Sequence, residues 1–269
     1  MTDMKQQILD SLPRNCPWRK NIHWFDSTDS TNDQAKALAR QGAPHGTVLI
    51  AGHQTGGRGR MGRTFQSPAG MDVYLSVILR PQCRPENLMH LTCAAAVAMC
   101  HAVETAAGIR PGIKWINDLV WNRKKLGGIL TELSVDSRTG MTEYAIVGIG
   151  INCCQQEQDF PPELEAIATS LAMATGKEIV PAKLAAAMIF HLGQMDADLL
   201  VKKSQTMDFY RKHCITLGKE ISVHRSEQVR YGKAMDLDSD GCLLVAFDDG
   251  KTESVNAGEV SIRGMYGYL

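Results

Sequence analysis

The feature that most constrains this chain is a loop rich in glycine and arginine between residues 53 and 67, H-Q-T-G-G-R-G-R-M-G-R-T-F-Q-S. Its central eight residues, 56–63, hold four glycines and three arginines, and no acidic side chain occurs in the whole stretch. Glycine lets the backbone approach a ligand closely, and arginine offers a planar set of donors that matches carboxylate and phosphate oxygens. This composition predicts an anion-binding loop.

Three other motifs overlap the loop, and each needs a context that the sequence does not favour. G-x-G-x-x-G matches residues 57–62, and a P-loop differs only at Arg63, but both motifs require a helix directly afterwards. Instead, a proline and a glycine at 68–70 precede an alternating apolar strand. An arginine-glycine segment for nucleic acid is the third interpretation, and it is not favoured because the loop is short and joins two expected strands.

Composition excludes several classes of protein. The 269 residues have a formal net charge of +0, so no global field attracts DNA or an anionic membrane. The N-terminus lacks a signal-peptide pattern, and we find no run of about 18 apolar residues that would span a bilayer. Fewer than about 25 residues precede the first functional-looking cluster, too few for an N-terminal helix-turn-helix domain. We therefore expect a cytoplasmic protein.

The cysteines and histidines do not indicate a metal site. None of the eight cysteines forms a C-x-x-C pair, and Cys93 and Cys100 lie seven residues apart in an apolar helical run. This spacing is typical of buried thiols in a reducing compartment. The eight histidines match no metal-ligand pattern, and His53, beside the glycine loop, is the one histidine with a possible function.

Hydrophobic periodicity divides the chain into expected elements. Strands are expected at 22–25, 47–52, 73–79, 126–135 and 143–152. Helices are expected at 8–14, 87–107, 163–174, 182–202 and 205–216, and a further helix follows the polar run at 26–33. After Gly218, short strands at 221–224, 229–236, 242–247 and 252–255 predict a small separate domain resembling a β-barrel.

Three further clusters carry candidate functional residues. In the polar run D-S-T-D-S-T-N-D, helix capping is the favoured role of Ser30, Thr31 or Asn32, but one cap needs only one such residue. The remaining donors and acceptors are then available to a polar ligand. In V-G-I-G-I-N, glycine weakens a strand, so something lies flat against Gly148 and Gly150, either a packed helix or a bound ligand.

The third cluster is G-I-K-W-I-N-D-L-V-W-N-R-K-K-L-G-G-I-L-T-E at residues 112–132. Lys114, Asn117 and Asp118 are expected near a strand end, and N-R-K-K predicts the tight turn of a hairpin. A basic run of this kind usually forms a solvated turn. Only Lys125, beside the Gly127–Gly128 pair, has a specific case for function.

Five motifs in order resemble those of biotin protein ligases: S-T-N at 30–32, Q-x-x-G-R-G-R-x-G-R at 54–63, K-W-x-N-D at 114–118, K-L-x-G-I-L at 125–130 and G-x-G-x-N at 148–152. The resemblance extends from about residue 22 to the C-terminus. It implies an α+β fold of the class II synthetase type, with a mixed, largely antiparallel sheet flanked by helices in residues 1–217. A small SH3-like barrel would follow in residues 218–269, and the resemblance is to the monofunctional type without a DNA-binding domain.

The resemblance also implies a reaction and its partners. Biotin and ATP, with Mg²⁺, would give biotinyl-5'-AMP, and the biotinyl group would then pass to a lysine of a biotin carboxyl-carrier domain of acetyl-CoA carboxylase or a related carboxylase. No DNA or membrane partner is implied, whereas a homodimer is possible. The glycine loop would close over the adenylate as a lid.

Site residues follow from the matched motifs. The implied catalytic residues are Arg58, Lys114, Asp118 and Lys125. The implied biotin-binding residues are Ser30, Thr31, Asn32, Gln54, Gly57, Arg58, Gly59, Arg60, Lys125, Gly128, Gly148 and Gly150. The implied ATP or adenylate residues are Arg58, Arg60, Arg63, Phe65, Asn117, Lys125 and Asn152, and Asp118 is a possible neighbour of Mg²⁺.

Three positions depart from the family's usual pattern. Ile116 stands in place of proline, Phe65 in place of tryptophan, and Asp72 in place of asparagine. Phenylalanine still stacks on adenine, so we expect weaker nucleotide affinity and no loss of activity. Asp72 would add a negative charge near the phosphates. Two competing hypotheses are a lipoate ligase, which lacks the full arginine loop, and a catalytically idle sensor of biotin or its adenylate.

Overall fold

A seven-stranded sheet lies at the centre of the computed structural model, which describes residues 3–63, 70–225, 227–256 and 260–264. The strands lie in the order β1-β2-β3-β7-β6-β5-β4, and β1 and β2 are parallel whereas the other neighbours are antiparallel. Their bounds are β1 Ile22–Phe25, β2 Thr47–Ala51, β3 Asp72–Leu79, β4 Gly112–Lys114, β5 Asp118–Trp121, β6 Lys124–Val135 and β7 Thr142–Asn152. The predicted mixed, largely antiparallel sheet is confirmed.

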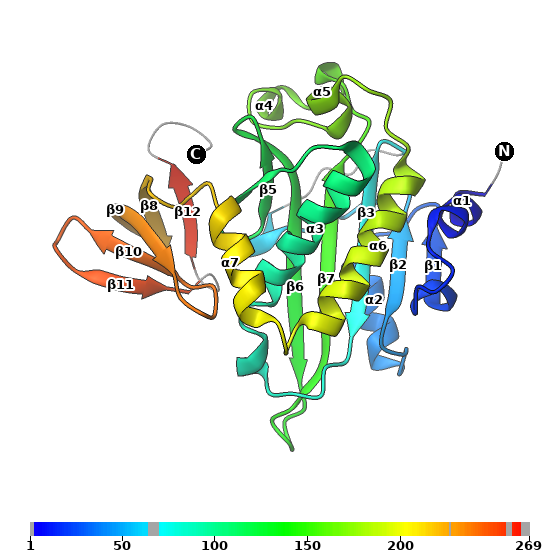
Figure 1. Cartoon of the computed structure of the whole chain (residues 1–269), viewed down its shortest axis with the longest axis horizontal. Helices are drawn as coiled ribbons and strands as arrows, with labels where there is room; N and C mark the ends of the chain where they lie inside the picture. Colours follow the sequence, from blue (N-terminus) through cyan, green and yellow to red (C-terminus); the bar gives the residue numbers. More distant parts are fainter. Residues whose placement is uncertain (1–2, 64–69, 226, 257–259, 265–269) are drawn as a thin grey trace.

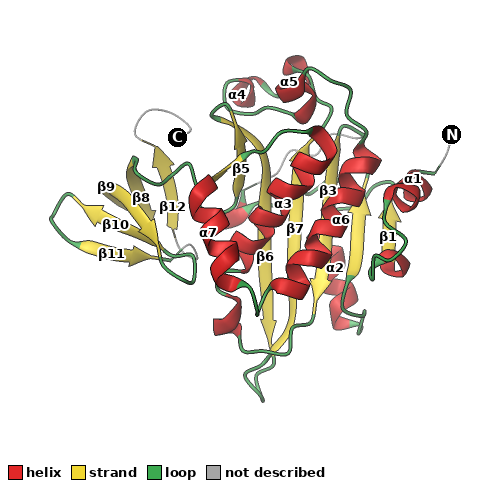
Figure 2. Ribbon diagram, viewed as in Figure 1, coloured by secondary structure: helices red, strands yellow, loops and turns green. Residues whose placement is uncertain are grey.

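Helices cover both faces of this sheet (Figures 1 and 2). Helices α3 (Leu91–Ala107), α6 (Pro181–Asp198) and α7 (Lys203–His213) lie on one face, where they pack onto the large core formed by alternate strand residues. Helix α2 (Thr31–Arg40) lies on the other face, over a smaller cluster. Because side chains alternate along a strand, β3 contributes residues from one face to the large core and from its other face to the smaller cluster. Helix α1 (Met4–Ser11) packs beside α6 and β1.

A second, five-stranded antiparallel sheet follows α7 and lies at the left of Figure 1. Its order is β11-β10-β9-β8-β12. The strands are β8 Glu220–Arg225, β9 Gln228–Leu237, β10 Leu243–Phe247, β11 Thr252–Val255 and β12 Val260–Gly264. The predicted C-terminal β-structure is confirmed, and sequence reasoning missed β12. Trp115 joins the two sheets, since its indole N–H donates to the Gly241 carbonyl at 2.8 Å.

The predicted helix over residues 163–174 was wrong. The structure instead has two short helices, α4 (Pro162–Glu165) and α5 (Leu171–Thr175). The chain between them pairs with Lys125, whose backbone N–H donates to the Ile167 carbonyl at 2.7 Å and whose carbonyl accepts from Thr169 N–H at 2.8 Å. These tertiary hydrogen bonds replace the intrahelical bonds that local propensity favoured.

Other helix boundaries also differ from the predicted ones. Helix α1 begins before residue 8, because Asp3 caps it by accepting a hydrogen bond from Lys5 N–H at 3.1 Å. A 3₁₀ turn at Pro85–Leu88 precedes α3, which ends at Gly108 with a φ of 73°. Helix α7 ends at His213. Cys214 then forms a parallel bridge with Ile113 of β4, and Ile215 N–H donates to the Ile113 carbonyl at 2.9 Å.

The segment Pro85–Ala107 has the length and hydropathy of a membrane-crossing helix, although we found no such run in the sequence. Its most apolar window is 67% buried inside the protein. Helices α6 and α7 pack against α3, and the fully buried Cys93, Ala95, Met99 and Cys100 face this core. The apolar character of the segment is therefore explained by its place in the core.

Candidate functional site

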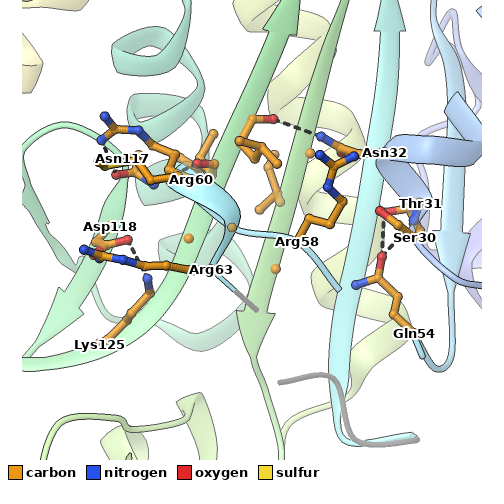
Figure 3. A pocket seen from close by; sticks show the side chains of 18 residues that line it. Ser30, Thr31, Asn32, Gln54, Arg58, Arg60, Arg63, Asn117, Asp118 and Lys125 are labelled. Atoms are coloured by element: carbon orange, nitrogen blue, oxygen red, sulfur yellow. Dashed lines mark hydrogen bonds and ion pairs between the residues drawn. The ribbon is translucent and has the colours of Figure 1, made fainter. Parts of the chain in front are cut away.

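A polar cavity lies on the α2 face of the large sheet, beneath the arginine loop (Figure 3). The loop, the N-terminus of α2 and the strands β5, β6 and β7 all contribute to it. Its lining residues are Ser30, Thr31, Asn32, Gln54, Arg58, Gly59, Arg60, Met61, Arg63, Asn117, Asp118, Lys125, Gly128, Ile129, Leu130, Gly148, Ile149 and Gly150. All five motifs singled out in the sequence therefore contribute to one cavity.

Strand register makes the cavity floor flat. Gly150 lies between Tyr74 on β3 and Gly128 on β6, and Gly128 pairs with Asp118 on β5. Two glycines in adjacent strands thus occupy neighbouring positions of one row and contribute no side chain of their own to the floor. Leu130 pairs with Gly148 in the next row and adds an apolar side to the floor. A flat floor of this kind accepts a ring system against the backbone.

The glycines have different structural roles. A Cβ built on Gly148 would lie 1.8 Å from Asn32 Oδ1, so this glycine gives room to the first turn of α2. A Cβ on Gly128 would lie 3.4 Å from Lys125 Nζ and 3.6 Å from Asp118 Oδ1, which are ordinary contacts. Helix packing therefore explains Gly148. Gly148 and Gly150 also line the cavity, and a bound ligand against them stays a prediction.

The start of α2 forms the polar end of the cavity. Ser30 occupies the N-cap position, as predicted, but its side chain makes no capping hydrogen bond. Gln54 caps the helix instead, because its Oε1 accepts a hydrogen bond from Thr31 N–H at 2.8 Å and lies 3.1 Å from Thr31 Oγ1. Figure 3 shows Gln54 and Thr31 turned toward each other at this end. The hydroxyl of the buried Ser30 is thus left to the cavity.

Three arginines of the loop line the cavity in different ways. The Arg58 guanidinium pairs with Asp33 on α2, with Nη1 and Oδ1 2.6 Å apart. Burial would raise the pKa of Asp33, but hydrogen bonds from Lys36 and Arg58 outweigh it, and the pKa lies below its usual value. Arg60 donates to Asn117 Oδ1 at 3.2 Å, and burial lowers the pKa of its guanidinium. An arginine remains charged despite such a shift.

The backbone of the loop explains its glycine content at one point. The loop turns through a short 3₁₀ segment at Arg60–Gly62, in which Met61 has a φ of 55° and Gly62 a φ of 71°. Two successive left-handed residues are easiest when one is glycine. This turn places Arg60 and Arg63 on the same side of the cavity, facing Asn117, Asp118 and Lys125 (Figure 3).

Lys125 and Asp118 meet at the far side of the floor. Lys125 Nζ lies 2.7 Å from Asp118 Oδ1, and both side chains are partly buried. The hairpin turn between their strands was predicted correctly, and its residues Asn122 and Arg123 have φ of 47° and 65°. Among the described lining residues, four are cationic (Arg58, Arg60, Arg63 and Lys125) and one is acidic, Asp118. The cavity therefore favours anions.

Four of the predicted site residues are not among the described residues that line the cavity. Gly57 is a buried residue of the loop. Lys114 is buried on β4, where it pairs with Asp118 along the backbone. Asn152 is buried and donates to the Thr169 carbonyl at 2.9 Å. Phe65 lies outside the described residues. Their functional roles remain predictions.

The two described departures from the usual pattern are both buried. Ile116 is in the core, and its carbonyl accepts from Tyr210 OH at 3.0 Å. Asp72 accepts hydrogen bonds from Tyr74 OH, Cys153 N–H and Gln155 Nε2 at 2.6, 2.9 and 2.7 Å. Burial raises the pKa of Asp72 to about 7, against the effect of these bonds. Asp72 is not among the described residues that line the cavity, and an effect of its charge on a bound phosphate stays a prediction.

Sequence reasoning missed three residues that support the site from behind. Asp33 holds Arg58, Glu132 Oε2 accepts from Asn32 Nδ2 at 2.9 Å, and Ser76 Oγ lies 2.7 Å from Asn32 Oδ1. Ser76 could have been noticed, because it is a small polar residue within the mainly apolar strand β3. Nothing in the sequence indicated the partners of Asp33 and Glu132.

The described residues contain no group of three or more histidine, cysteine or acidic side chains that could hold a metal ion by itself. All eight cysteines are free thiols, as predicted. Asp118 is the one carboxylate among the described lining residues. Mg²⁺ commonly binds through one or two carboxylates together with substrate phosphates, and this donor set suits a metal that arrives with a nucleotide.

Comparisons with known proteins agree with this geometry. Residues 24–152 match the Biotin/lipoate A/B protein ligase family, and residues 216–263 match the Biotin protein ligase C terminal domain. The bifunctional ligase/repressor BirA of Bacillus subtilis is 36% identical over 232 residues, which are 86% of this chain and 71% of that protein.

Two further likenesses extend over nearly the whole length of the known protein. The biotin--[acetyl-CoA-carboxylase] ligase of Mycobacterium tuberculosis is 31% identical over 254 residues, covering 90% of this chain and 89% of that one. The solved structure of biotin protein ligase from Aquifex aeolicus in complex with biotin and ATP has a TM-score of 0.77 and 30% identity, and the match covers 91% and 99% of the two chains. The chain therefore belongs to the biotin protein ligase family.

Proposed function

We propose that this protein joins biotin to AMP and then transfers the biotinyl group to a lysine of a biotin carboxyl-carrier domain. One observation carries the proposal. A glycine floor lies between a polar end at α2, where Arg58 also lies, and a group of three cationic side chains, Arg60, Arg63 and Lys125, all within one cavity. A ligand with a polar ring at one end and a carboxylate at the other fits this distribution. The family membership and the biotin and ATP bound to the Aquifex aeolicus protein support the same function.

The first step joins two anions. A biotin carboxylate oxygen attacks the α-phosphorus of ATP, the bond to the β-phosphate oxygen breaks, and pyrophosphate leaves with that electron pair. Repulsion between carboxylate and phosphate opposes this approach, and fixed cationic donors in a site shielded from water reduce the repulsion. Lys125 and Arg58 are assigned to the reacting carboxylate and phosphate. Arg60 and Arg63 are assigned to the remaining phosphates of ATP.

The second step uses the energy of the mixed anhydride. The neutral amine of the carrier lysine attacks the biotinyl carbonyl, an amide bond forms with loss of one amine proton, and AMP leaves with the electrons of the broken carbon–oxygen bond. Asp118 is assigned to this step or to a Mg²⁺ ion that enters with ATP, because it is the carboxylate nearest to Lys125. Bound Mg²⁺ would supply charge neutralisation at the phosphates.

The other assignments follow the position of each residue. Ser30, Thr31, Asn32 and Gln54 are assigned to the ureido end of biotin, and Gly59, Gly128, Gly148 and Gly150 to its ring and tail. Asn117 is assigned to the adenylate through its contact with Arg60. Gly57, Lys114, Asn152 and Phe65 keep the roles expected from the motifs. We further propose a cytoplasmic enzyme without a DNA or membrane partner, and a homodimer remains part of the proposal.

Transfer of labelled acid to a carrier domain tests this function. The protein is incubated with ATP, Mg²⁺, a biotin carboxyl-carrier domain and labelled biotin, lipoate or octanoate, and the label on the carrier is measured. We expect label from biotin alone, and none on a carrier whose acceptor lysine is replaced by arginine. Label from lipoate or octanoate in place of biotin would identify a lipoate-type ligase. Biotin binding without transfer would identify a sensor and would overturn the proposal.

A further inference from the structure

The Arg58 side chain turns away from the other cationic side chains of the cavity. Its guanidinium lies at the α2 end, toward Asn32, whereas Lys125 and the other two arginines lie together at the opposite side of the glycine floor (Figure 3). Arg58 Nη1 lies 2.6 Å from Asp33 Oδ1. The proposed function assigns Arg58 to a carboxylate and a phosphate that react beside Lys125. The guanidinium must therefore leave Asp33 when the ligand binds.

Asp33 is a counterion that Arg58 shares with a lysine. It lies in the first turn of α2 and is not among the described residues that line the cavity. Lys36 Nζ lies 2.7 Å from the same oxygen, Asp33 Oδ1, and 3.0 Å from Glu132 Oε1. When Arg58 leaves, Lys36 still neutralises Asp33. The release of Arg58 thus avoids the large cost of leaving a buried charge without a partner.

The contact between Arg58 and Asp33 is weak enough to be exchanged. The Arg58 side chain is 47% exposed and that of Asp33 is 35% exposed, so water screens their attraction. The contact joins one guanidinium nitrogen to an oxygen that Lys36 also approaches. A ligand carboxylate or phosphate can accept two parallel N–H bonds from an arginine, and this geometry is stronger than a single contact. A ligand anion therefore competes well with Asp33 for the guanidinium.

Support of the helix is the alternative role of Asp33. An acidic residue in the first turn of a helix interacts favourably with the helix dipole, and Asp33 and Lys36 form an ion pair across one turn. Neither effect involves Arg58, and neither depends on the charge of a ligand. The contact with Arg58 comes in addition and connects α2 to the arginine loop. Ligands with and without a negative charge therefore separate the two roles.

We propose that Asp33 holds the Arg58 guanidinium at the α2 end of the empty cavity and yields it to the negatively charged end of the ligand. Asp33 is a positioning residue, because it acts through Arg58 and makes no contact with the reacting atoms. The exchange subtracts the strength of the Arg58–Asp33 contact from the binding of an anionic ligand. The inference rests on the proposed function, in which Arg58 contacts the reacting carboxylate and phosphate.

Binding of biotin is compared with that of biotinamide, in which a neutral amide replaces the carboxylate. Asp33→Asn keeps the shape of the side chain and removes its charge, and Lys36 keeps Glu132 as its partner. The variant is expected to bind biotin about threefold to fivefold more tightly than the wild type, as for the loss of one partly exposed ion pair. Its dissociation constant for biotinamide should stay within about twofold of the wild-type value. Calorimetry measures both ligands, and Asp33→Ala repeats the test with a side chain that cannot hydrogen-bond.

The Arg58→Ala protein shows whether the effect passes through Arg58. No guanidinium is then left to be released, so adding Asp33→Asn should change the dissociation constant for biotin by less than about twofold. Tightening as large as in the wild-type background would show that removal of a negative charge near the cavity acts through space. That result would overturn the inference.

Asp208→Asn is the matched control, since Asp208 forms a similar ion pair across one turn of α7, 2.9 Å from Arg211, and does not line the cavity. It should leave the binding of both ligands unchanged. Weaker or unchanged binding of biotin in folded Asp33→Asn and Asp33→Ala proteins would overturn the inference, and so would equal tightening of biotin and biotinamide. Failure of the wild type to bind biotin at all would refute the proposed function itself, and the inference with it.

Discussion

Lys125 Nζ lies 2.7 Å from Asp118 Oδ1, within a cavity that three arginines also line. The two residues come from neighbouring strands of one hairpin, and Asp118 pairs with Gly128 at the edge of the glycine floor. The carboxylate holds the ammonium beside the floor, and an arriving carboxylate or phosphate finds that ammonium already positioned. Such preorganised charge is the most effective source of electrostatic stabilisation in enzymes.

Substitution of the floor glycines should separate ligand binding from stability. Gly128→Ala adds a methyl group with ordinary contacts of 3.4 and 3.6 Å, so the protein should keep its melting temperature within about 2 °C while the KM for biotin rises about tenfold. Gly148→Ala places its methyl group 1.8 Å from Asn32 Oδ1 and should destabilise the protein by about 1–3 kcal/mol. Thermal unfolding and biotin titration measure both effects. Equal loss of stability in the two variants would contradict the assignment of Gly128 to ligand binding and Gly148 to helix packing.

The resemblance to biotin protein ligases implied that the five motifs share one site, and each of them contributes described residues to the cavity lining. Arg58, Lys125 and Gly148 all reach the same cavity, as expected. The supporting contacts were not predictable in the same way. Asn32 and Glu132 are 100 residues apart, and their contact depends on the register between β6 and β7 and on how α2 lies over them.

Local propensity also failed where tertiary hydrogen bonding was stronger. Residues 163–174 have a helical composition, but the pairing of 167–169 with Lys125 splits the helix. The burial of Asp72 was not foreseen for a related reason. The departure from the family pattern suggested a negative charge near the phosphates, and the fold surrounds this carboxylate with Tyr74, Cys153 and Gln155. In both cases the contacts are ones that the sequence alone does not define.

The buried Asp72 should make stability depend on pH. Because its folded pKa is raised to about 7, the folded protein keeps a proton that the unfolded chain loses near pH 4. This contribution to stability is complete below about pH 4 and is lost as the pH rises through about 7. Asp72→Asn should therefore match the wild type near pH 4 and exceed its free energy of unfolding at pH 8, by at most about 4 kcal/mol.

Urea unfolding of both proteins across this pH range measures the difference. Taking the difference between variant and wild type removes the contributions of all other titrating groups. A constant difference from pH 4 to pH 8 would show that Asp72 does not retain its proton, and the burial argument would then be wrong.

The arginine loop should become resistant to trypsin when biotin and ATP bind. Cleavage after Arg58, Arg60 and Arg63 is expected to slow by about tenfold, because ligand contacts order the loop over the adenylate. Arg138, in the turn between β6 and β7, has an 89% exposed side chain and serves as an internal control. Its cleavage should not change. Loop cleavage that is equally fast with and without ligands would contradict the proposal that the loop acts as a lid.

The central claim is that Lys125 acts on the reacting carboxylate and phosphate, and biotin-dependent exchange of labelled pyrophosphate into ATP tests it most directly. The neighbouring Lys124 is the control, because its Nζ donates to the Glu165 carbonyl at 2.8 Å and it does not line the cavity. Lys125→Ala should reduce the exchange rate by about a hundredfold, and Lys124→Ala by less than about threefold. Exchange at the wild-type rate in a folded Lys125→Ala protein would contradict the account.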